Sequence, residues 1–115
     1  MASFLLVHGA WHGAWFWEPV VAALEVGGHQ TRAVDLPGHG ADPTPLAECT
    51  LAGYVDRVAQ ALEDLPDDSV ILVGHSMGGM VVSAVAERCA ERIGWVVYVA
   101  AFLPRDGDRM VDLMA

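Results

Sequence analysis

One five-residue stretch, Gly74-His75-Ser76-Met77-Gly78, constrains this chain more than any other feature of its sequence. It follows a short apolar run at Ser69–Val73 and opens a segment, Met77–Glu91, whose apolar residues recur at helical spacing. Glycines two residues before and two residues after a serine permit a turn so tight that the serine takes a strained backbone conformation. The stretch therefore predicts a strand, a sharp turn and a helix, with the Ser76 hydroxyl raised above the end of a sheet.

A serine presented in this way is a candidate nucleophile. The N–H of Met77 begins the following helix, where the macrodipole favours negative charge, so it is a candidate hydrogen-bond donor to an oxyanion. The alternative is a chance Gly-x-Ser-x-Gly string in a glycine-rich loop. The strand predicted before Ser76 and the helix predicted after it favour the catalytic interpretation.

A second loop, His8-Gly9-Ala10, follows the apolar run Phe4–Val7. In an open α/β sheet this loop is expected beside the turn at Ser76, where successive strands diverge and ligands bind. The N–H of Ala10 is then the second oxyanion donor, because Gly9 lets the backbone approach a reacting carbonyl. We predict Gly9, Trp11 and His75 as substrate-binding residues.

The nearby histidines and tryptophans have structural alternatives. His8 is expected to be held in its loop by backbone hydrogen bonds rather than to act as a base. His75 is expected to point away from Ser76, and it has no partner at a metal-ligand spacing, so neither a base nor a metal ligand is assigned to it. Trp11, Trp15 and Trp17 are expected to pack the first helix onto the sheet, or one of them to line an acyl or alcohol pocket.

Strands and helices alternate along the chain. The expected strands are Phe4–Val7, Gln30–Val34, Ser69–Val73 and Trp95–Ala101. The first expected helix has about three turns, carries Trp17, Val20, Val21 and Leu24 on its apolar face and is stopped by Gly27-Gly28. The other expected helices are Leu51–Leu65, after the cap residue Thr50, and Met77–Glu91. Short connections between alternating elements predict an α/β chain, with a three-layer αβα arrangement around a parallel sheet of about four strands and three helices.

Composition excludes several classes of partner. The formal net charge is −9 and no Lys/Arg cluster is present, so neither nucleic acid nor an anionic membrane surface is an expected partner. Cys49 and Cys89 match neither a metal-ligand pattern nor a disulfide framework, and we expect partly or fully buried thiols in a reducing compartment. The sequence shows no secretory leader pattern or membrane span, and it predicts a cytoplasmic protein without a cofactor or metal.

Three segments together resemble one branch of a known family: His8–Trp15, Gly74–Gly79 and Ala100–Pro104. They are similar to the α/β-hydrolases of the plant methylesterase and hydroxynitrile lyase group and their bacterial esterase relatives. A hydroxynitrile lyase of that group carries threonine after the first histidine and a Glu-Ser-Cys turn, whereas this chain has Gly9 and His75-Ser76-Met77. The resemblance therefore implies the esterase branch, and the loop Asp35–Gly40 is closer to bacterial members than to plant members.

The resemblance also implies that the chain is incomplete. Such hydrolases are about twice as long, with a cap after the fourth strand expected here and then a triad acid and a triad histidine, in the order Ser, Asp, His. We therefore expect residues 1–115 to be the N-terminal part of a single α/β-hydrolase domain, with the cap and the C-terminal triad segment absent. Asp106, Asp108 and Asp112 fall where the family begins its cap, so none is assigned as the acid.

The resulting hypothesis is a carboxylic ester hydrolase that acts through an acyl-enzyme on Ser76 and takes a small-molecule ester. The 115-residue chain alone is expected to be inactive, and its fourth strand, left at an edge, to promote edge-to-edge self-association. Two alternatives remain open. One is a ligand-binding or interaction protein on the same half-fold, and the other is an enzyme like the hydroxynitrile lyases.

Overall fold

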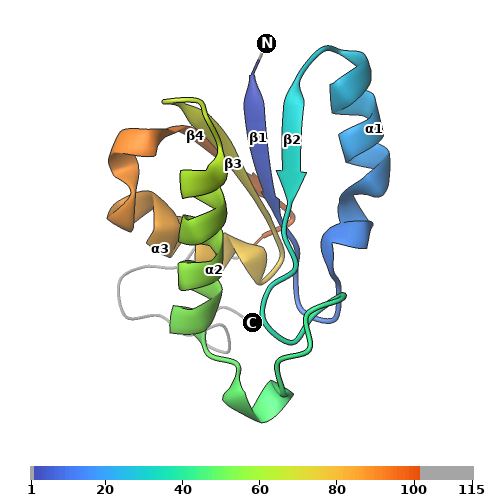
Figure 1. Cartoon of the computed structure of the whole chain (residues 1–115), viewed down its shortest axis with the longest axis vertical. Helices are drawn as coiled ribbons and strands as arrows, with labels where there is room; N and C mark the ends of the chain where they lie inside the picture. The colour runs from blue at the N-terminus through green and yellow to red at the C-terminus, as the bar shows by residue number, and fades with distance from the viewer. Residues whose placement is uncertain (1, 102–115) are drawn as a thin grey trace.

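A computed structural model describes residues 2–101, which form one parallel four-stranded sheet covered by three helices (Figure 1). The strands are β1 (Ser3–Val7), β2 (Gln30–Ala33), β3 (Val70–His75) and β4 (Ile93–Val99), arranged in the order β2-β1-β3-β4. The helices are α1 (Glu18–Val26), α2 (Leu51–Asp64) and α3 (Gly78–Arg88), with 3-10 turns η1 (Ala14–Trp17), η2 (Leu46–Glu48) and η3 (Ala90–Arg92). The α/β fold with a parallel sheet is confirmed.

Successive residues of the central strands point to opposite faces of the sheet and divide the core in two. Leu5 and Leu72 belong to a large buried cluster with α2 and α3, whereas Leu6 and Val73 belong to a small cluster with Trp17. Figure 1 shows α2 and α3 together on one side and α1 apart from them. The chain therefore has three layers, with one face of the sheet packed far more extensively than the other.

The helix α2 is stabilised by an N-cap and by an apolar face, both of which can be recognised in the sequence. The Thr50 side chain accepts a hydrogen bond from the N–H of Gly53, which satisfies one unpaired donor of the first turn. Val55, Val58 and Leu62 recur at helical spacing and are buried against the sheet. Leu51, predicted on the same face, is instead 44% exposed because it lies in the first turn, beyond the packed stretch.

Two expectations about element boundaries are wrong. The helix after Ser76 ends at Arg88 rather than Glu91, because Cys89 leaves the helical conformation and a short 3-10 turn follows. The fourth strand runs over Ile93–Val99 rather than Trp95–Ala101, and it pairs with β3 through an irregularity at Val70/Ile71. Local apolar runs do not encode this register, since it is set by pairing with β3.

The strand β4 lies at an edge of the described sheet and is apolar on an exposed surface. Trp95, Val97 and Val99 are 71%, 40% and 42% exposed. Register pairs Trp95 with Ile71 and Val97 with Val73, which places these side chains on the thinly covered face of the sheet. On the opposite face, the Tyr98 hydroxyl and the Ser83 Oγ lie 2.7 Å apart in a hydrogen bond that joins β4 to α3.

Within residues 2–101, no helix combines the length and the apolar character that crossing a bilayer requires. Both cysteines are free and partly buried, as expected.

Candidate active site

Ser76 lies between the end of β3 and the start of α3, in the tight turn that its glycines predicted; this turn, residues 74–78, is called the elbow below. Its φ is 54°, in the left-handed region that non-glycine residues rarely occupy, so the expected strained backbone is confirmed. A Cβ at Gly74 would lie 2.7 Å from the Gly78 carbonyl oxygen, and one at Gly78 would lie 2.6 Å from the carbonyl oxygen of Val7. The turn therefore needs both glycines, the second because α3 begins against the end of β1.

The loop after β1 lies directly against this turn, as the sheet order predicted. A Cβ at Gly9 would meet the Ser76 Cβ at 2.9 Å and the His75 carbonyl oxygen at 3.1 Å. Neighbouring β1 and β3 end at the same edge of the sheet, while the chain leaves them toward α1 on one face and α3 on the other. This is the position where open α/β sheets bind ligands.

Two backbone donors next to Ser76 are unengaged. In the described part of the chain, neither the Ala10 N–H nor the Met77 N–H donates a hydrogen bond to another residue. Met77 is the N-cap residue of α3, so its N–H lies at the positive end of the helix dipole, which favours negative charge nearby. These are the two donors that the oxyanion assignment needs.

His8 is structural, as expected. It is fully buried; its Nε2 accepts the N–H of Leu36 at 3.0 Å, and its Nδ1 lies 2.7 Å from the Gly9 carbonyl oxygen. Both contacts are satisfied by the neutral ring with a proton on Nδ1. Burial lowers the pKa of His8 below its usual value of 6.5, which agrees with that neutral form.

The His75 ring turns toward η1. It stacks on Phe16 with ring centroids 4.4 Å apart and meets His12 edge-on at 5.6 Å. Burial, and secondarily the neighbouring His12, lower the pKa of His75. Sequence analysis did not anticipate this aromatic group around the elbow, because His12 and Phe16 show no periodicity of their own.

The three tryptophans of the first loop do not behave alike. Trp17 is 2% exposed and packs onto the sheet with Leu6 and Val73, as predicted. Trp11 and Trp15 are 84% and 55% exposed, so the packing interpretation is wrong for them. Trp11 has a φ of 67°, a strained conformation that turns its side chain out of the loop beside Gly9 and Ala10.

All five histidines of the chain lie in the described residues, and none of them hydrogen-bonds to Ser76 there. His29 accepts the N–H of Ala2, and His39 contacts the Pro37 carbonyl and the His8 ring. No group of three or more potential metal-ligating side chains gathers within residues 2–101. Asp106, Asp108 and Asp112 lie outside the described residues.

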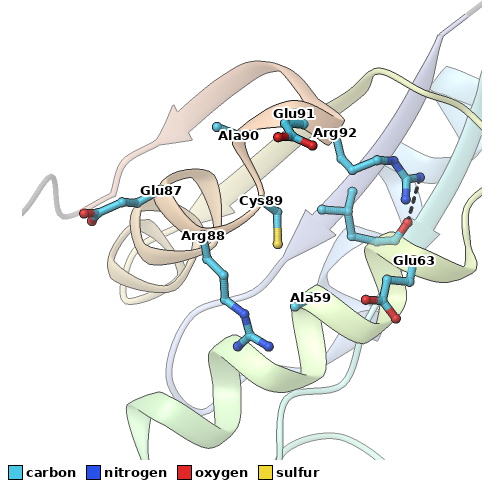
Figure 2. Close-up of a pocket in the computed structure, with 9 residues that line it drawn as sticks. Ala59, Glu63, Glu87, Arg88, Cys89, Ala90, Glu91 and Arg92 are labelled. Atoms are coloured by element: carbon cyan, nitrogen blue, oxygen red, sulfur yellow. Dashed lines mark hydrogen bonds between the residues drawn. The ribbon is translucent and has the colours of Figure 1, made fainter.

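A cavity of about 410 Å³ lies elsewhere, between α2 and the end of α3 (Figure 2). Arg88, Cys89 and Arg92 line it together with acidic residues, whereas Ser76, Ala10 and Met77 do not. Arg92 is committed to structure, because its guanidinium donates to the carbonyls of Leu62, Leu65 and Asp67 at the end of α2. The cavity is therefore separate from the elbow.

One residue near the elbow was missed by the sequence analysis. Asp35 follows β2, and its carboxylate accepts the N–H groups of Ala14 and Ala41. The only signal in the sequence was a glycine at position 40; in the structure Gly40 has a φ of 56°, and a Cβ there would overlap the Asp35 carboxylate.

The chain is similar in sequence and in fold to a group of known proteins. The profile described as "Alpha/beta hydrolase family" matches residues 4–115. The chain is 43% identical over 115 residues to the "Carbendazim hydrolyzing esterase" of Nocardioides sp., and 46% identical over 105 residues to Methylesterase 7 of Arabidopsis thaliana. Among solved structures, it resembles an extracellular alpha/beta-hydrolase from a Paenibacillus species, with a TM-score of 0.90 and 32% identity.

These matches cover most of this chain and about half of the other proteins. They include 99%, 89% and 97% of this chain, but only 48%, 40% and 46% of the Nocardioides, Arabidopsis and Paenibacillus proteins respectively. The chain therefore spans less than half the length of these relatives.

Proposed function

The chain belongs to the alpha/beta hydrolase family, and from this premise we propose that it is the nucleophile-bearing, N-terminal part of a carboxylic ester hydrolase. Ser76 is the proposed nucleophile. It attacks the carbonyl carbon of a small ester, the alcohol leaves, and water then releases the acyl group from the Ser76 Oγ. The sequence of the chain and the names of its relatives both fit this assignment.

The observation that carries the proposal is the strained Ser76 backbone packed against Gly9. A left-handed serine between a strand and a helix is costly to maintain and is typical of a site that presents a nucleophile. The distance of 2.9 Å from a Cβ at Gly9 to the Ser76 Cβ brings the neighbouring Ala10 N–H into the same region. An oxyanion formed at Ser76 would accept hydrogen bonds from Ala10 and Met77, and each such donor is worth roughly 10²–10³-fold in rate.

The general base is proposed to come from outside residues 2–101. Ser76 stays protonated and weakly nucleophilic without a base, and none of the five histidines contacts it. His8 is excluded by its two backbone hydrogen bonds, and the His75 ring packs on Phe16. The triad acid and histidine implied by the family resemblance would lie in the part of the relatives that this chain does not match.

Substrate contacts are proposed for the residues that surround the elbow. Gly9 packs against Ser76 and His75. Trp11, which follows Ala10 in the chain, presents an exposed aromatic side chain next to them. A cyanohydrin lyase is the less favoured enzyme, because a threonine in place of Gly9 would collide with Ser76 in this arrangement.

The test is ester hydrolysis by the full-length gene product and its Ser76→Ala variant. With p-nitrophenyl acetate, Ser76→Ala is expected to reduce kcat/KM by at least about 10³-fold, since it removes the bond-forming atom. Ser83→Ala is the matched control, because Ser83 lies on the same helix-turn segment but its hydroxyl contacts Gly79 and Tyr98 instead. Equal activity of Ser76→Ala and the unmodified protein would refute the proposal.

A further inference from the structure

We infer that the Asp35 carboxylate is a positioning residue, which fixes the loop carrying the Ala10 N–H against the elbow. The inference rests on the proposed function, since it concerns how the second oxyanion donor is held. Asp35 does not touch the reacting atoms. It acts through the backbone of residues 9–14, and its contacts on both sides of the loop can be followed one by one.

The carboxylate joins two loops that are remote in sequence. Its Oδ1 accepts the N–H of Ala14 at 2.8 Å, and its Oδ2 accepts the N–H of Ala41 at 3.3 Å. Ala14 begins η1 and follows residues 9–13, which carry the Ala10 N–H and are called the oxyanion loop here. Ala41 follows the Pro- and Gly-containing loop after β2. A hydrogen bond to a charged acceptor is about twice as strong as a neutral one, so the carboxylate links the two loops directly.

Two glycines make room for the carboxylate. A Cβ at Gly40 would overlap Asp35 Oδ1, and a Cβ at Gly13 would lie 3.0 Å from the same oxygen and 2.8 Å from the Gly40 Cα. Gly40 also has a φ of 56°, which side chains rarely allow. The backbone of both loops is thus wrapped closely around one side chain, as expected where that side chain sets the loop geometry.

The path from Asp35 to the oxyanion donor is short. Ala14 is preceded by Gly13 in an extended conformation, and the His12 N–H closes a turn on the Gly9 carbonyl oxygen at 3.3 Å. Ala10 lies inside that turn. With Gly9 fixed against Ser76 at one end and Ala14 fixed by Asp35 at the other, the peptide that carries the Ala10 N–H has little freedom to rotate.

The main chain of Asp35 is itself held in place by hydrogen bonding to α2. Arg57 of α2 donates to the Asp35 carbonyl oxygen at 2.9 Å and forms an ion pair with Asp42. Asp42 in turn accepts the N–H groups of Gly38 and Thr44. Asp35 is therefore fixed on its main chain by α2 while its side chain holds the oxyanion loop.

Two pairs of variants in the full-length gene product isolate this role. Asp35→Ala removes both acceptor atoms, whereas Asp35→Asn keeps one oxygen for the Ala14 N–H. Ala14→Pro removes only the donor, at the first position of η1 and after an extended Gly13, where proline is tolerated. Ala14→Ser keeps the N–H and is its matched control.

We expect Asp35→Ala and Ala14→Pro each to lower kcat for p-nitrophenyl acetate by about 10–100-fold, with KM changed less than about 3-fold. This range lies below the cost of deleting an oxyanion donor outright, because the Ala10 N–H would be misplaced rather than lost. Asp35→Asn and Ala14→Ser are expected to remain within about 5-fold of the parent. The double variant is expected to be no worse than the poorer single variant, because both single variants remove the same hydrogen bond between the Ala14 N–H and the Asp35 carboxylate.

Three results would overturn the inference: unchanged kcat in folded Ala14→Pro, losses confined to KM, or fully additive losses in the double variant. If Asp35→Ala does not fold, the comparison of Ala14→Pro with Ala14→Ser decides the question by itself. Ser76→Ala, run alongside, separates the two claims. Full activity of Ser76→Ala removes the proposed function, and the amide NMR signal of Ala10 then decides whether Ala14→Pro, but not Ala14→Ser, displaces the loop.

Discussion

At Gly9 and Ser76 two loops meet with no side chain between them. Gly9 has no positive φ, so its importance is steric: a methyl group there would lie 2.9 Å from the Ser76 Cβ and 3.1 Å from the His75 carbonyl oxygen. Neither neighbour is the end of a flexible side chain. A substitution must therefore move the backbone of one of the two loops.

Gly9→Ala is expected to destabilise the protein by about 1–3 kcal/mol and to lower kcat more than it raises KM, since it displaces Ala10 from the elbow. Gly53→Ala is the matched control, because in α2 only the Thr50 Oγ1 lies within contact, at 3.2 Å, and alanine favours a helix. Denaturant unfolding and ester hydrolysis measure both effects. A fully stable and active Gly9→Ala would contradict the close packing of the two loops.

The buried neutral His8 makes stability depend on pH in a defined direction. Because burial lowers its pKa in the folded state, the unfolded chain binds a proton more readily below pH 6.5. The free energy of unfolding is therefore highest above that value and falls as the pH decreases toward the folded-state pKa of His8. The lowered pKa of His75 acts in the same direction.

Guanidinium titrations at about pH 8 and about pH 5.5 test this dependence. The parent is expected to be less stable at the lower pH, and His8→Gln to show a smaller difference between the two conditions, with the remainder due to His75. An identical pH dependence in His8→Gln would show that His8 is not the group responsible.

At the scale of elements, local sequence predicts where helices and strands occur better than where they end. The apolar spacing of Val55, Val58 and Leu62 placed α2, and the glycines around Ser76 placed the elbow. The end of α3 was not predictable, because Arg92 of the following 3-10 turn donates to carbonyls in the last turn of α2 and just beyond it, some 25–30 residues earlier in the chain. Such contacts override local propensity and leave no periodic signal.

The same reasoning separates the predicted and unpredicted parts of the site. Ser76 and Met77 were selected from a motif that strongly constrains the backbone, and Ala10 was selected from the place of its loop after the first strand. The role inferred for Asp35 depends on which two loops the fold brings together, so the sequence indicated a loop at Asp35–Gly40 but not its contact with Ala14. The exposure of Trp11 was not predicted, because a large aromatic side chain next to a buried strand is usually buried with it.

The exposed edge strand β4 is expected to promote self-association of the isolated chain. Its exposed apolar residues and lack of an outer partner within the described sheet favour pairing with another chain. The isolated 115-residue chain is expected to form dimers or larger species, and Trp95→Lys to reduce that association because an edge lysine opposes strand pairing. Gln30→Lys, on the polar edge strand β2, is the control and should change little.

Size-exclusion chromatography with light scattering, at several concentrations, measures this effect. A monomer at every concentration, or association that Trp95→Lys leaves unchanged, would mean that β4 is not the surface involved.

At the scale of the whole molecule, the two faces of the sheet are unequally covered. Among residues 2–101, thirteen buried residues form a cluster beneath α2 and α3, whereas three form a cluster beneath α1, which itself has no buried residue. The relatives are more than twice as long as the matched region. Both observations fit a chain that supplies the nucleophile and oxyanion loops and relies on further polypeptide for the base.

The isolated 115-residue chain is accordingly expected to hydrolyse p-nitrophenyl acetate at least about 10²-fold more slowly than the full-length gene product, because general-base assistance contributes roughly 10²–10⁴-fold. Initial rates at equal molar concentration provide the comparison. Comparable, Ser76-dependent rates would show that one of the five histidines in the chain serves as base after all.

If Ser76 is the nucleophile, its Oγ carries the acyl group of the ester between the two steps of the reaction, and this acyl-enzyme can be trapped. The full-length gene product is mixed with p-nitrophenyl acetate, quenched in acid within the first turnover, digested and examined by mass spectrometry. One acetyl group is expected on the peptide that contains Ser76, and none on that peptide in the Ser76→Ala variant. Rapid hydrolysis with no acetyl group on Ser76, or with the acetyl group on another residue such as Cys89, would contradict it.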